Sequence, residues 1–81
     1  GRARSRSERM VCSSPDLAER DRRMSSIYYS ALAESDGATR RRLRASRDRF
    51  LHYRENCPNA ACIAQAYEDR IDEIRDIAAG R

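Results

Sequence analysis

Lysine and tryptophan are absent from this sequence, histidine occurs once, and glycine and proline together occur only five times. No apolar run reaches 18 residues, which argues against a membrane-spanning helix in this chain. Glycine-rich loops and a second histidine, which many active sites use, are also missing. The chain is long enough for only one small core, and this length excludes large enzyme folds. We therefore expect a non-catalytic protein.

The single histidine also argues against a metal centre. A zinc site would have to combine His52 with Cys12, Cys57 and Cys62. His52 and Cys57 are five residues apart on one predicted helix and would point about 140° away from each other. We therefore expect neither a metal ion nor another cofactor.

All seventeen basic residues are arginines, against thirteen acidic residues, which gives a net charge of +4. Residues 1–9 hold four of the arginines and one glutamate, and they have almost no apolar side chain. Such a segment cannot bury enough surface to become ordered, so we predict a flexible basic tail over residues 1–11. The remaining residues, 12–81, are expected to form a single helical domain.

Three helices are expected in that domain, over residues 14–35, 39–56 and 59–78. The first begins at a serine cap followed by Pro15, and we expect Gly37 to end it in the left-handed conformation. Pro58 stops the second helix, and Asn59 caps the third. Apolar side chains recur in the third at spacings of three and four, at Ala60, Ile63, Tyr67, Ile71, Ile74 and Ala78.

No segment alternates between apolar and polar residues with a period of two, and the predicted connections between helices are short. These features predict an all-α protein, a small three-helix antiparallel bundle that carries the flexible tail at its N-terminus.

The predicted helices differ in charge. Residues 13–36 and 59–81 each carry a net charge of −2, and residues 37–57 carry +5. Ion pairing between a basic helix and two acidic ones explains this pattern most simply. The alternative is an arginine-rich module that binds nucleic acid or another polyanion through Arg40, Arg41, Arg42 and Arg44. Because no aromatic residues are interleaved with these arginines, nucleic acid is not the partner that we expect.

Two charged residues interrupt the apolar stripes. Asp21 lies between Leu17 and Met24, and Arg54 lies between Phe50 and Cys57. Both should point inward, and antiparallel helices would bring them together. Because a buried charge without a partner is costly, we predict a structural ion pair between Asp21 and Arg54.

The three cysteines leave at least one residue without an intramolecular partner. A bridge between Cys57 and Cys62 would contribute about 2 kcal/mol in the loop-entropy model, and one between Cys12 and Cys57 about 4 kcal/mol. These values do not decide the pairing. A small domain of this kind often gains a disulfide in an oxidising compartment, which favours export.

Residues 12–74 resemble the N-terminal domain of LprI-type lysozyme inhibitors, a family of small exported bacterial helical domains. The first matching block is Cys12, then Pro15-Asp16-Leu17-Ala18, Asp21-Arg22-Arg23-Met24 and Tyr28. The second runs from Leu43-Arg44-Ala45 through Phe50-Leu51 and Tyr53-Arg54-Glu55 to Cys57. The third is Cys62-Ile63, Tyr67-Glu68-Asp69-Arg70-Ile71 and Ile74.

The resemblance implies a periplasmic or secreted protein without catalysis of its own, which binds a protein partner such as a lysozyme and occludes its surface. It also implies a Cys57–Cys62 disulfide, with Cys12 left unpaired. Since common secreted lysozymes are basic, an acidic surface would favour binding. The candidate partner-binding face is the carboxylate cluster near the C-terminus, formed by Asp69, Asp72, Glu73 and Asp76.

Overall fold

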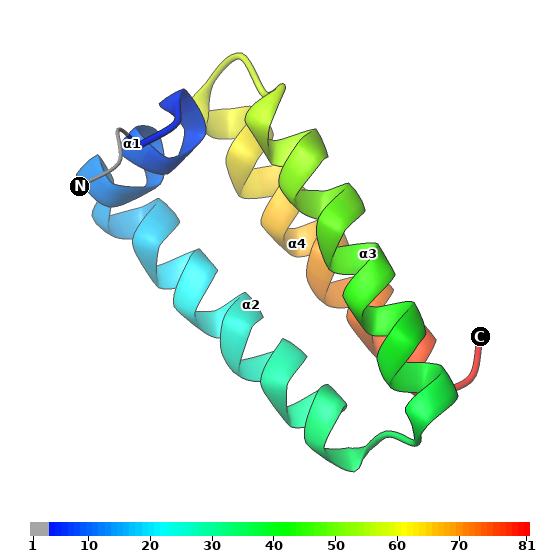
Figure 1. The fold of residues 1–81 in the computed structure, drawn as a ribbon. Coiled ribbons are helices and arrows are strands. Elements are labelled where there is room, and N and C mark those ends of the chain that lie inside the picture. The colour runs from blue at the N-terminus through cyan, green and yellow to red at the C-terminus, as the bar shows by residue number, and fades with distance from the viewer. Residues whose placement is uncertain (1–3) are drawn as a thin grey trace.

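The computed structural model describes residues 4–81. They form four helices and no strand: α1 (Arg6–Ser13), α2 (Pro15–Glu34), α3 (Gly37–Glu55) and α4 (Ala60–Ala78). Helices α2 and α3 run in opposite directions, α4 returns beside α3, and α1 lies at the end of the molecule where α3 turns into α4 (Figure 1). The predicted all-α class is confirmed.

The prediction of three helices with a flexible N-terminal tail is wrong, because residues 6–13 form α1. Ser5 caps this helix by accepting a hydrogen bond from the backbone N–H of Glu8, and Val11 is buried in the core. Of the rest of the predicted tail, residues 4 and 5 lead into α1, and residues 1–3 lie outside the described residues. The arginine-rich composition therefore gave no sign of this short helix, which is stabilised by the packing of Met10 and Val11 and by the cap at Ser5.

Contacts with residues far along the chain hold α1 in place. Arg6 donates a hydrogen bond from Nη2 to the carbonyl of Cys57 at 2.6 Å, and Ser7 donates from Oγ to Oε2 of Glu55 at 2.6 Å. The Ser7 side chain is fully buried. These bonds fix α1 against the C-terminal end of α3.

The turn between α2 and α3 differs from the expectation that Gly37 closes α2. Ser35 ends α2, and Asp36 caps α3 by accepting a hydrogen bond from the backbone N–H of Thr39 at 2.8 Å. That bond is the main reason why the pKa of Asp36 is lowered. Gly37 is the first residue of α3, and Gly80 is the only residue with a positive φ in the described part of the chain. The turn therefore depends on an aspartate cap and not on a left-handed glycine.

The core lies where α4 packs against α2 and α3. Leu43 of α3 and Ile63, Tyr67 and Ile74 of α4 have no exposed surface, and Leu17 of α2 is almost as deeply buried. A disulfide between Cys57 and Cys62 joins the end of α3 to the start of α4, and it contributes about 2 kcal/mol by restricting the unfolded chain. Cys12 is exposed and its thiol is free.

The docking of α1 predicts a pH-dependent stability. Hydrogen bonds from Ser7 and then Ser5 lower the pKa of Glu55, so their contribution is present at neutral pH and is lost as the pH falls through the lowered pKa. We expect Glu55→Gln to be less stable than the wild type near neutral pH and equally stable in strong acid. Urea unfolding followed by circular dichroism between about pH 7 and about pH 2 measures this difference.

Glu34→Gln serves as the matched control, because Glu34 is exposed at the far end of α2. A constant stability difference between Glu55→Gln and the wild type across this pH range would contradict the assigned role of the Glu55 carboxylate.

Candidate functional site

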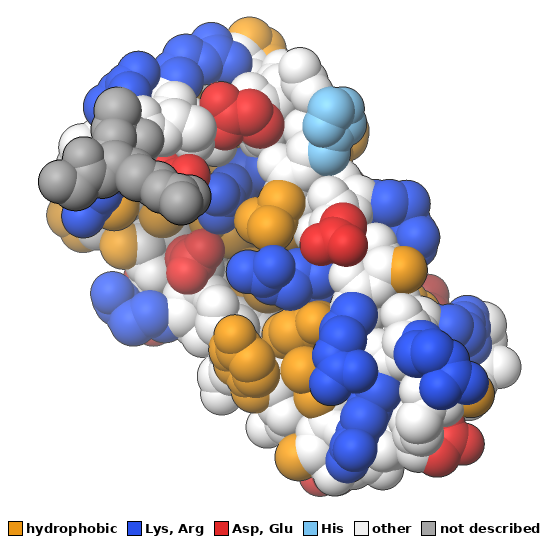
Figure 2. Space-filling model, in the orientation of Figure 1, with side chains coloured by type: hydrophobic (Ala, Val, Ile, Leu, Met, Phe, Trp, Pro, Cys, Tyr) orange, Lys and Arg blue, Asp and Glu red, His pale blue; other side chains and the backbone are white. Residues whose placement is uncertain are grey.

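A cleft of about 470 Å³ is bounded by α1, α2 and α3, and α4 contributes one residue to it. Figure 2 shows this side of the molecule, where apolar side chains lie between charged ones. The lining residues are Glu8, Val11, Cys12, Asp21, Met24, Ser25, Tyr28, Tyr29, Arg47, Phe50, Leu51, Arg54 and Arg70. This volume is in the range of small-molecule sites.

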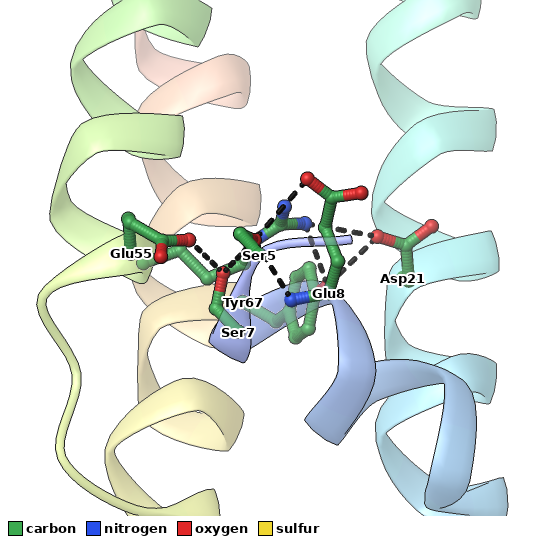
Figure 3. Close-up of polar contacts among 7 residues, drawn as sticks. Ser5, Ser7, Glu8, Asp21, Glu55 and Tyr67 are labelled. Carbon is green, nitrogen blue, oxygen red and sulfur yellow. Dashed lines mark hydrogen bonds and ion pairs between the residues drawn. The ribbon is translucent and has the colours of Figure 1, made fainter. Parts of the chain in front are cut away.

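Asp21 and Arg54 lie together at one end of the cleft, with Nη1 of Arg54 3.7 Å from Oδ2 of Asp21. Tyr67 of α4 links them, since its hydroxyl donates to Oδ2 of Asp21 at 2.7 Å and accepts from Nη1 of Arg54 at 3.3 Å. Figure 3 shows Tyr67 pointing toward Asp21 from the neighbouring helix. Burial, together with the Asp21 hydrogen bond, raises the pKa of Tyr67, so its hydroxyl remains a donor at neutral pH.

Arg70 is the most deeply buried charged residue of the described chain, with 2% of its surface exposed. Its Nη1 donates to Oγ of Ser46 at 2.6 Å and to Oε1 of Glu73 at 2.9 Å. The guanidinium carbon lies 5.2 Å from the ring centre of Tyr28 and 5.7 Å from that of Phe50. The charge is therefore held by one carboxylate, one hydroxyl and two aromatic rings.

Sequence reasoning missed the roles of Tyr67 and Arg70. The sequence pattern places Tyr67 only in the apolar stripe of the third predicted helix, and it predicts no role for Arg70. The available signal was the position of Arg70, three residues after Tyr67 and four before Ile74, which places it on the buried side of a helix.

The four carboxylates of the predicted partner-binding face do not share one environment. Asp69, Asp72 and Asp76 are exposed. Glu73 is half-buried, bonded to Arg70 and 3.7 Å from Nη2 of Arg49. Gln65 donates to Asp69 at 3.0 Å, and Arg81 lies 3.5 Å from Asp76. Glu73 thus pairs with a buried arginine, while the three aspartates face solvent.

The arginines of the basic helix α3 form fewer ion pairs with neighbouring helices than the charge pattern of the sequence predicts. Within residues 4–81, Arg49 and Arg54 are its only arginines that lie within 4.0 Å of a carboxylate on another helix. Glu68 instead joins α4 to α2, at 3.2 Å from Arg20 and 3.6 Å from Arg23. Arg41 and Arg44 are exposed on α3 and form no ion pair in the described part of the chain.

In the part of the chain that the structure describes, no group of three or more histidine, cysteine, aspartate or glutamate side chains is placed to hold a metal ion. No helix in residues 4–81 is both long and apolar enough to cross a membrane.

Comparisons with known proteins gave one match. The family model described as lysozyme inhibitor LprI matches residues 1–74 of this 81-residue chain. Neither the curated proteins nor the solved structures gave a match.

The contacts of Asp21 predict a stability effect. Asp21→Asn removes the charge that faces Arg54, whose side chain is only 12% exposed. Since Asp21 itself is about one-third exposed, we expect a loss of about 1–3 kcal/mol, less than for a fully buried pair. Urea unfolding measures this loss, and Asp48→Asn, at an exposed position of α3, is the control.

A double-mutant cycle with Tyr67→Phe tests whether the hydroxyl belongs to the same network. A coupling energy above about 0.5 kcal/mol is expected for residues in contact. Additive effects of the two substitutions would show that Asp21 and Tyr67 act independently.

Proposed function

This chain belongs to the lysozyme inhibitor LprI family, and from that membership we propose that it binds a lysozyme outside the cytoplasm and blocks it by occlusion. The protein performs no catalysis in this proposal. The single observation that carries it is the family match, which spans residues 1–74 of the chain.

Two features of the chain support this proposal, one for the location and one for the occlusion. The Cys57–Cys62 disulfide is typical of proteins that fold in an oxidising compartment, which supports a location outside the cytoplasm. Inhibition by occlusion is favoured by a surface that keeps its shape on binding. The disulfide, the docked α1 and the α2–α4 ion pairs at Glu68 all restrict movement of the helices.

We assign the lysozyme-binding face to the exposed aspartates of α4. Asp69, Asp72 and Asp76 follow one another at spacings of three and four, so they lie along one side of the helix. Their charge is complementary to a basic lysozyme, although the whole chain is basic. Glu73 is excluded from this face because it is half-buried and its carboxylate is bonded to the buried Arg70.

The proposal predicts dose-dependent inhibition of a basic c-type lysozyme in a peptidoglycan turbidity assay. Inhibition should approach completion near a one-to-one ratio at physiological salt. The triple variant Asp69→Asn/Asp72→Asn/Asp76→Asn should associate about tenfold more slowly, because these charges steer the encounter. Biolayer interferometry on immobilised lysozyme measures the association rate.

The control variant is Asp48→Asn/Glu34→Gln, which neutralises two exposed carboxylates outside α4. It should inhibit as the wild type does. No inhibition at a large molar excess would overturn the proposed activity for that lysozyme. Full inhibition with an unchanged association rate in the triple variant would instead overturn only the assignment of the face.

A further inference from the structure

We propose that the cleft bounded by α1, α2 and α3 binds a small organic carboxylate, with the anion at the arginines and an apolar body against the aromatic wall. This inference goes beyond the proposed lysozyme inhibition and does not depend on it. It rests on the buried arginine groups of the cleft, on its charge and on its apolar lining.

The first observation is a set of unused hydrogen-bond donors. Nε and Nη2 of Arg70 and Nε of Arg54 are buried, and none has a hydrogen-bond partner within the described residues. Both side chains line the cleft. Such groups are costly when they are left unpaired. Nε and Nη2 form one edge of the Arg70 guanidinium, and that edge fits the two oxygens of a carboxylate. The edge has almost no exposed surface, so a carboxylate reaches it only when side chains of the cleft wall move aside.

The second observation is that Arg47, an exposed arginine of the cleft lining, forms no ion pair within the described residues. The other two arginines of the lining are paired, Arg54 with Asp21 and Arg70 with Glu73. Asp21 is already engaged by Tyr67 and Arg54, and Glu8 is exposed and bonded to Ser5. Burial lowers the pKa of Arg70, Glu73 and Tyr28 oppose this effect, and the positive charge of Arg47 makes the smallest contribution, a further lowering. An anion between Arg47 and Arg70 would relieve this repulsion.

The third observation selects the class of anion. Apolar side chains make up much of the remaining lining: Val11, Met24, Tyr28, Phe50 and Leu51. Tyr28 and Phe50 also hold the guanidinium of Arg70 between their rings. All but Leu51 belong to the core and are at most 9% exposed, so only their edges face the cleft. An aromatic or branched carboxylate would cover these apolar edges, whereas a fully hydrated ion such as phosphate would not.

The test uses nuclear magnetic resonance of the isotopically labelled full chain, with Cys12→Ser in every sample to prevent intermolecular disulfides. Benzoate is the probe, benzyl alcohol supplies the same ring without charge, and inorganic phosphate supplies charge without a ring. We expect benzoate to shift the Nε–H signals of Arg54 and Arg70 in a saturable manner. Benzyl alcohol should leave these signals unchanged, and phosphate should bind at least about tenfold more weakly than benzoate.

Two variants locate the binding. Ser25→Glu places a carboxylate on the wall of the cleft and should abolish benzoate binding, while Arg47→Gln should weaken it severalfold. Arg41→Gln removes an exposed arginine of α3 outside the cleft and should bind benzoate as the parent does. Retained backbone spectra show that each variant is folded.

Three results would overturn the proposal. They are the absence of saturable shifts with benzoate, equal affinity for phosphate and benzoate, and unchanged benzoate binding in Ser25→Glu. None of these results depends on whether the protein inhibits a lysozyme, so failure of one proposal can be distinguished from failure of the other.

Discussion

The structure depends on the burial of two guanidinium groups in a very small core. Arg70 is 2% exposed and the Arg54 side chain is 12% exposed, at positions where helices of this size ordinarily place leucine or isoleucine. Several other side chains provide hydrogen-bond or ion-pair partners for these charges. Glu73 turns inward from an otherwise solvated row, Ser46 is buried beside Arg70, and Tyr67 places its hydroxyl between Asp21 and Arg54. Without such partners, the free-energy cost of burying these charges would exceed the free energy of unfolding of a domain of this length.

This polar interior also explains how a chain with few large apolar residues specifies one arrangement of helices. Apolar side chains can pack in several registers, whereas the Asp21–Tyr67–Arg54 contacts join α2, α4 and α3 at one level. We interpret these contacts as the reason for the alignment of the three long helices. The disulfide and the docked α1 then restrain the end of the molecule where α3 meets α4.

The sequence predicts the parts of the fold that depend on local chemistry. Helix α2 begins at the capping residue Ser14 with Pro15 in its first turn, and α4 begins at the capping residue Asn59. The spacing of apolar residues in α4 identifies its buried side. Helix α1 was missed because its stabilising partners, Glu55 and the carbonyl of Cys57, are about fifty residues away. The cleft could not be predicted for the same reason, since its lining comes from four helices. An inward position could be inferred for Asp21 and Arg54, but the bridge through the hydroxyl of Tyr67 depends on the position of α4 between them.

The free thiol of Cys12 has a practical consequence. The other two cysteines are joined in the disulfide, so Cys12 is the single site in this chain at which a maleimide reagent reacts under non-reducing conditions. The residue is exposed on α1 and lines the cleft. A fluorophore attached there would sit beside Tyr28, Tyr29 and the arginines, and its emission would report what enters the cleft without any engineered mutation.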